Sequence, residues 1–200
     1  QIPVIPTIEW TEPHLLARAE WIKVFGILMD KAAIADSIFN QTCQHYQALT
    51  QLAQSANNKP VIMSGLPFKD TWYMPGGNSF MGQLFKDANT SYHYQNTPET
   101  SSLPISFETA WYHFQDANIW VGIDADNTQQ LLQMDKRLHN FKAVKHNQLF
   151  HYRKRTTPTG GNDFWESAMV YPHRLLHDLI TVTHPNLLPY DSCFYIGPVL

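Results

Sequence analysis

Short apolar runs alternate with helix-like segments after Pro60, and this alternation constrains the fold more than any other feature of the sequence. Residues 119–123 form a continuous apolar run, which is typical of a strand buried on both faces of a parallel sheet. Shorter runs at 61–63, 71–74 and 149–152 are further candidate strands. Strands that alternate with helices predict an α/β fold with a mostly parallel sheet.

The segments between these strands carry signals of helix starts. Asn78 or Ser79 is placed to cap one helix, and Ser106 is placed to cap another. The polar stretch 96–104 between them is predicted to be a loop. These signals agree with the alternation of strands and helices.

The segment 13–57 is predicted to be helical, with a break near Asp30 and Lys31. Its first half is apolar on two faces, and such a helix must be covered on both. A bridge packed between two lobes fits this pattern, and an ordinary core helix fits it as well.

Composition limits the class of protein and its partners. Hydrophobic residues make up 44% of the chain, and the formal charge is -3. No basic stripe indicates a nucleic-acid partner, and no apolar run approaches the ~20 residues of a membrane span. Residues 1–6 read as a strand already in progress, so we expect a chain that begins inside an earlier lobe. The two cysteines, Cys43 and Cys193, are expected to be unpaired thiols.

Motifs of catalysis are absent from the sequence. Gly76-Gly77 is neither a Walker loop nor a dinucleotide fingerprint. Ser64 lacks the flanking glycines of a nucleophile elbow. We therefore expect no catalytic residues, no cofactor and no enzymatic activity.

The terminal segment combines an apolar helix with a histidine pair. Pro172 opens an amphipathic helix in which Leu176 and Leu179 follow the spacing of a core stripe. His173 and His177 lie one turn apart, a spacing at which two imidazoles can bind a metal. No other ligand motif accompanies the pair, so we predict no metal site.

Four stretches resemble helical-backbone (class III) substrate-binding proteins of ABC importers, the group that handles iron-siderophores, haem and cobalamin. They follow the same order over nearly the whole chain. They are residues 12–23 (EPHLLARAEWIK), 72–77 (WYMPGG), 106–121 (SFE followed by DANIWV) and 164–189 (FWES, YPHRLLHDLI and HPNLLP). The resemblance implies two α/β lobes of the chelatase-like superfamily, joined by a rigid helix, with the ligand held between them.

On this resemblance the chain is a C-terminal, Rossmann-like lobe preceded by a lobe-connecting helix. Residues 1–12 would end a truncated N-terminal lobe, 13–57 would form the connecting helix and the next one, and 58–200 would form the C-terminal lobe. The implied role is capture of an iron chelate (siderophore or haem) or cobalamin in the periplasm. Delivery would be to a membrane permease and its ATPase. A lipid anchor in the missing N-terminal segment, in a Gram-negative bacterium, is expected.

Three candidate ligand residues, Trp72, Tyr73 and Met74, end a strand just before a Gly-Gly turn. Open α/β sheets bind ligands beyond the carboxyl ends of their strands, and aromatic faces there would stack on a flat ligand. Packing of the same side chains in the core is the alternative interpretation.

Three further candidates complete the predicted ligand site. Ser79 lies at a helix start, where free backbone N–H groups would receive an anionic group. Arg153 begins a cationic loop that suits an anionic chelate, with a solvated loop as the alternative. Trp165 precedes the terminal helix, where it either faces the cleft or seals the core.

Two other functions stay open at this point. A direct zinc or manganese receptor would need a site of histidines and carboxylates at the cleft. A chelatase-like enzyme acting on tetrapyrroles would need a cleft histidine with an acidic partner, for which His173 and His93 are the nearest candidates.

Overall fold

The computed structural model, which describes residues 4–200, contains a four-stranded sheet at its centre. Its strands, in spatial order, are β1 (Ile62–Ser64), β5 (Ile119–Val121), β6 (Leu149–His151) and β7 (Gly197–Pro198). The first three run parallel, and β7 is antiparallel to β6. This arrangement confirms the predicted α/β fold with a mostly parallel sheet.

A second sheet of three antiparallel strands lies beside the first. It consists of β2 (Pro67–Phe68), β3 (Thr71–Pro75) and β4 (Ser102–Ser106), with β3 in the middle. The prediction that 96–104 is loop is therefore wrong for its last residues, which pair with β3. The candidate strand 71–74 belongs to this small sheet and not to the parallel one, because its side chains alternate between buried and exposed.

Nine α-helices and four short 3-10 helices occur within the described residues. The α-helices are α1 (Leu15–Glu20), α2 (Ile22–Leu28), α3 (Ala32–Gln54), α4 (Phe80–Asp87), α5 (Phe107–Phe114), α6 (Thr128–Met134), α7 (Lys142–Lys145), α8 (Ser167–Val170) and α9 (Pro172–Thr183). The 3-10 helices are η1 (Glu9–Thr11), η2 (Lys136–Asn140), η3 (Asp163–Trp165) and η4 (Tyr190–Ser192). Within these residues no helix combines the length and apolar character needed to cross a membrane.

The predicted helix starts and the predicted helix break are confirmed. The Oγ atoms of Ser79 and Ser106 accept hydrogen bonds of 3.1 Å from the backbone N–H groups of Gly82 and Thr109. Asp30 adopts a φ of 55° between α2 and α3, which reverses the chain. The helical segment 13–57 is thus three helices, of which α3 is the long one.

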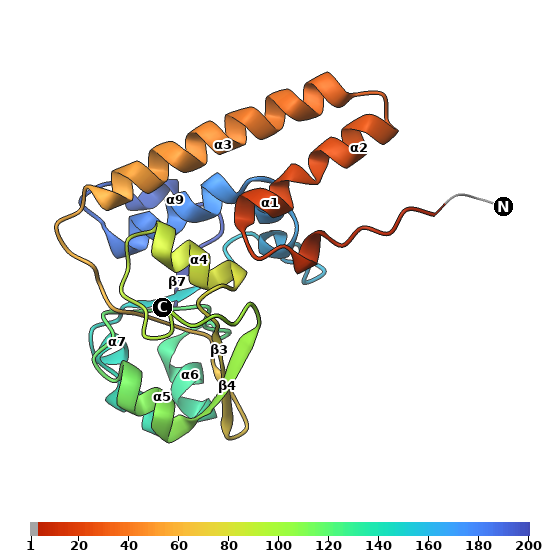
Figure 1. The fold of residues 1–200 in the computed structure, drawn as a ribbon. Coiled ribbons are helices and arrows are strands. Elements are labelled where there is room, and N and C mark those ends of the chain that lie inside the picture. Colours follow the sequence, from red (N-terminus) through yellow and green to blue (C-terminus); the bar gives the residue numbers. More distant parts are fainter. Residues whose placement is uncertain (1–3) are drawn as a thin grey trace.

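Helices cover both faces of the parallel sheet (Figure 1). The long helix α3 lies along α9, and α4 and α9 lie between α3 and the sheet. Helices α5, α6 and α7 lie on the opposite side. Burial on both faces explains why residues 119–123 are continuously apolar.

Aromatic side chains join the two sheets. The ring of Trp72, from β3, lies 5.4 Å from that of Trp120, from β5, and 5.8 Å from that of Phe141. All three side chains are fully buried. The small antiparallel sheet is therefore part of the same core as the parallel sheet.

The terminal helix α9 is anchored by its apolar face and by one carboxylate. Leu176 and Leu179 are fully buried, which confirms the predicted core stripe. Asp178 is also fully buried, and it accepts hydrogen bonds from the backbone N–H groups of Phe194 and Ile196. These bonds fix the segment that leads into β7.

The N-terminal segment docks through Arg18 on α1. Its guanidinium donates to the carbonyl oxygens of Glu12 (2.8 Å) and Trp10 (2.9 Å) and lies 4.5 Å from the ring centroid of Phe80. Of the strand predicted over residues 1–6, residues 4–6 have no regular structure, and residues 1–3 lie outside the described residues.

Both cysteines, Cys43 and Cys193, are free thiols, as expected.

Candidate functional site

The carboxyl ends of the three parallel strands meet at one edge of the sheet, which we call the carboxyl edge. Gly65 follows β1, Gly122 follows β5, and Tyr152 follows β6. Both glycines have a φ of 72°, a region that favours glycine. A Cβ atom on Gly122 would lie 2.8 Å from the Tyr152 ring. The chain can therefore turn and pack closely here only because these positions lack side chains.

Two buried indole rings support the carboxyl edge from the core side through hydrogen bonds. Trp72 Nε1 donates to the carbonyl oxygen of Ser64 at 3.0 Å, and Trp120 Nε1 donates to that of Gly65 at 2.7 Å. The sequence pattern predicted Trp72 as a wall of the ligand site. Its complete burial instead makes it a support beneath the edge.

The three residues Trp72, Tyr73 and Met74 separate into core and surface. Met74 is fully buried like Trp72, so neither side chain offers a surface to a ligand. Tyr73 points the other way along the alternating strand and is 52% exposed. Phe68, which is also exposed, lies on the same face of the antiparallel sheet. Of the predicted aromatic wall, only Tyr73 is accessible.

Ser79 is a buried helix cap. Its hydroxyl donates to the carbonyl oxygen of Gly76 at 2.6 Å and accepts from the N–H of Gly82. The backbone N–H groups of Asn78 and Ser79 already donate to the carbonyl oxygens of Glu99 and Gly76. The predicted anion cradle at this helix start is thus largely occupied by the protein itself.

Arg153 does lie at the carboxyl edge, but it is engaged by two carboxylates. Its Nη2 donates to Asp126 Oδ1 at 2.8 Å, and its Nε lies 3.3 Å from Asp124 Oδ1. Both aspartates belong to the loop between β5 and α6. They were not among the predicted site residues, although two acids directly after a buried strand are a signal of a polar site at a sheet edge.

Trp165 lies on the surface and is 69% exposed. Its ring packs edge-on against Phe164, with 4.7 Å between centroids. Phe164 is buried and stacks on Tyr152 at 4.5 Å. The core-sealing role left open for Trp165 is therefore filled by Phe164, and the stack connects Trp165 to the carboxyl edge.

Tyr152 is a further residue of the edge that sequence reasoning missed. Burial raises the pKa of its phenol well above the usual range, so the ring stays neutral. Its role is to pack between Gly122 and Phe164.

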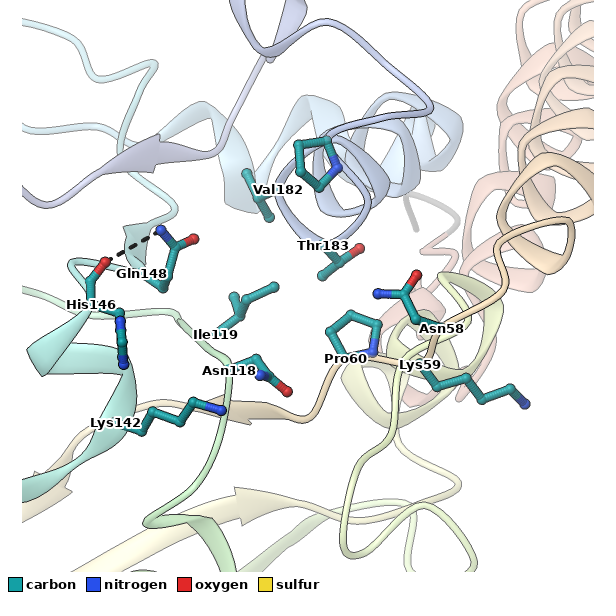
Figure 2. A pocket seen from close by; sticks show the side chains of 11 residues that line it. Asn58, Lys59, Pro60, Asn118, Ile119, Lys142, His146, Gln148, Val182 and Thr183 are labelled. Atoms are coloured by element: carbon teal, nitrogen blue, oxygen red, sulfur yellow. Dashed lines mark hydrogen bonds between the residues drawn. The ribbon is translucent and has the colours of Figure 1, made fainter.

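A large cavity lies at the other edge of the sheet, by the amino ends of β1, β5 and β6. Its volume is about 650 Å³, and Figure 2 shows Lys142 extending toward Asn118 while Lys59 points away. The lining residues are Asn58, Lys59, Pro60, Asn118, Ile119, Lys142, His146, Gln148, Val182, Thr183 and Pro185. None of the predicted ligand residues is among them.

Two smaller hollows lie near the predicted ligand residue Trp165 and at the histidine pair. One, of about 450 Å³, is formed by residues 155–166 after β6, next to Trp165 in the chain. The other, of about 390 Å³, lies between α3 and α9, where the rings of His45 and His173 are 5.3 Å apart. Among the side chains that the structure describes, no three from His, Cys, Asp or Glu are arranged to hold a metal ion.

An α/β lobe with a long helix packed along it is an architecture shared with solved periplasmic binding proteins. The chain belongs to the periplasmic binding protein family, whose sequence model matches residues 3–156. The family membership confirms the resemblance drawn from the sequence.

The chain is similar to curated proteins and to solved structures, and the solved structures agree with this assignment. An uncharacterized lipoprotein of Methanocaldococcus jannaschii is 23% identical over 92% of this chain and 43% of its own length. The TroA-like periplasmic binding protein FepB from Veillonella parvula matches with a TM-score of 0.68 and 13% identity, over 96% of this chain and 63% of its own. A periplasmic heme-binding protein from Pseudomonas aeruginosa matches with a TM-score of 0.67 and 17% identity, over 95% and 67%.

The chain spans about half the length of the curated relatives it matches. The solved structures share the helical-backbone fold of periplasmic binding proteins.

Proposed function

We propose that this chain forms the C-terminal lobe and connecting helix of the substrate-binding component of an ABC importer. The component captures an iron chelate (siderophore or haem) or cobalamin and delivers it to a permease and its ATPase. Family membership supports a binding role rather than catalysis. The solved relative from P. aeruginosa, described as heme-binding, supports a ligand of this size and shape.

One observation carries the proposal: two residues with exposed aromatic side chains, Tyr73 and Trp165, pack against the carboxyl edge of the sheet, the first through its backbone and the second through neighbouring rings. The carbonyl oxygen of Tyr73 lies 3.7 Å from the point where a Cβ on Gly65 would be. Trp165 reaches Gly122 through the stack of Phe164 and Tyr152. Aromatic faces stack on flat ligands such as porphyrins, corrins and catecholates. Ligands of open α/β sheets bind at this edge.

The domain boundaries follow from the same proposal. Residues 1–12 end the first lobe, 13–57 contain the lobe-connecting helix and its neighbouring helix, and 58–200 form the second lobe. The 23-residue helix α3 is the rigid connection. Because a helix resists bending, we expect only small closure on binding and a largely preformed cleft.

We place the protein in the periplasm, held at the membrane by a lipid anchor upstream of the described lobe. The relative described as a lipoprotein supports the anchor. A Gram-negative source stays a prediction of the sequence.

Titration of the protein expressed from its complete gene tests the function. Ferric siderophores, haem, cobalamin, Zn²⁺ and Mn²⁺ would be compared by calorimetry. Submicromolar binding of a chelate or tetrapyrrole supports the proposal. Tight binding of the bare metal ions alone would favour the direct metal receptor.

A further inference from the structure

The three cations that follow β6 each already have a partner in the protein. Arg153 is held by Asp124 and Asp126, at 3.3 and 2.8 Å. Lys154 Nζ donates to the carbonyl oxygen of Cys193 at 2.6 Å. Arg155 Nε donates to Asp163 at 2.8 Å, which leaves no cation of this loop without a contact.

The loops at the carboxyl edge carry an excess of negative charge. Loops 122–127 and 152–166 together hold four carboxylates and three cations, and loop 65–70 holds one of each. The two aspartates are also more accessible than the arginine between them. The side chains of Asp124 and Asp126 are 80% and 72% exposed, and that of Arg153 is 32% exposed. A ligand that approaches this edge therefore meets carboxylate oxygens before it meets the guanidinium.

The ferric chelates of the proposed ligand class differ in net charge. Three hydroxamates, each with one negative charge, neutralise Fe³⁺, whereas three catecholates, each with two, leave a net charge of about -3. Like charges brought together at an interface oppose binding and act as a filter on ligand choice.

We propose that the carboxyl edge selects neutral or cationic chelates, such as ferric trihydroxamates and corrinoids, against trianionic catecholates. Asp124 and Asp126 set this preference, and Arg153 positions them. The inference rests on the proposed function and narrows its ligand class. It also reverses the expectation that Arg153 attracts an anionic ligand, because that arginine is neutralised by its neighbours.

The experiment compares one ferric trihydroxamate and one ferric tris-catecholate on the complete protein, by calorimetry at low salt. We expect the trihydroxamate to bind at least tenfold more tightly. Salt screens charge interactions, so raising it should strengthen tris-catecholate binding and leave trihydroxamate binding nearly constant.

The double variant Asp124→Asn/Asp126→Asn removes the excess negative charge and frees Arg153. It should raise the affinity for the tris-catecholate roughly tenfold and change that for the trihydroxamate less than twofold. Asp116→Asn, an exposed acid before β5, is the matched control and should change neither affinity. A melting curve of each variant confirms that the fold is kept.

Two results would overturn the inference and leave the proposed function standing. One is tighter binding of the tris-catecholate by the unaltered protein, and the other is an unchanged charge preference in the double variant. Binding of cobalamin, which carries no excess negative charge, would support the inference in the same way as binding of the trihydroxamate. If no chelate or tetrapyrrole binds the unaltered protein, the proposed function itself fails.

Discussion

Tyr73 and Trp165 are exposed aromatic residues, and each directly follows a buried aromatic residue. Trp72 lies beneath Tyr73 in the core, and Phe164 lies beneath Trp165. In each pair the buried ring fixes the backbone, so the exposed ring is presented from a rigid base. Such preorganisation lowers the entropy cost of binding.

Changing Tyr73 or Trp165 to Ala in the complete protein should weaken ligand binding by about 1–3 kcal/mol, the usual cost of losing an aromatic anchor. The melting temperature should change little, because both side chains are exposed. Tyr112→Ala, an exposed aromatic change on α5, is the control and should leave affinity intact. An unchanged affinity in both variants would remove these residues from the site.

The sequence did not reveal which of the adjacent residues 72–74 face outward. All three are apolar enough to be buried, and only pairing with β4 sets the face. The acids Asp124 and Asp126 follow an apolar strand in the sequence, but their contact with Arg153 depends on the neighbouring strand order. Such contacts between distant segments are set by tertiary structure.

His173 makes stability depend on pH. Burial, with His45, Arg174 and His177 nearby, lowers the pKa of His173 to about 4, against about 6.5 when unfolded. Between these values the unfolded chain holds the extra proton, so the stability that is complete above pH 6.5 falls as pH drops toward 4.

Urea unfolding at pH 7 and pH 5 measures this effect. Between pH 7 and pH 5, the free energy of unfolding of the His173→Gln variant should fall less than that of the unaltered chain. His146→Gln, an exposed histidine, should lose as much as the unaltered chain. Equal losses of stability in all three proteins would contradict the assignment of this pH dependence to His173.

At the scale of elements, helix ends were predictable and the small sheet was not. Ser79 and Ser106 cap helices through local hydrogen bonds, which a sequence pattern can predict. Strand β4 contains Pro104 and exposed serines, a composition typical of a loop. It is tolerated as a strand because β4 lies at the edge of its sheet, where proline is permitted.

Helix α9 is the element whose packing is most directly testable. Leu176→Ala leaves a cavity in the core and should lower the free energy of unfolding by about 2–5 kcal/mol. Met134→Ala, at an exposed site on α6, should cost less than about 0.5 kcal/mol. Chemical denaturation measures both, and a small loss for Leu176→Ala would mean that α9 is not part of the core.

At the scale of the whole molecule, three places are compared as sites for the ligand. They are the carboxyl edge, the cavity by the amino ends of the strands and the groove between α3 and α9. We assign the ligand to the carboxyl edge, although the cavity of about 650 Å³ lies at the opposite edge. The reason is that the accessible residues Tyr73 and Trp165 and the positive-φ glycines Gly65 and Gly122 lie there, and the second lobe of the proposed protein would complete the cleft.

Hydrogen–deuterium exchange of the complete protein, with and without the chelate that titration identifies, tests this central claim most directly. We predict slower exchange on binding in residues 65–73, 122–126 and 152–166. Protection confined to residues 58–60 and 142–148, or to the α3–α9 groove, would contradict it.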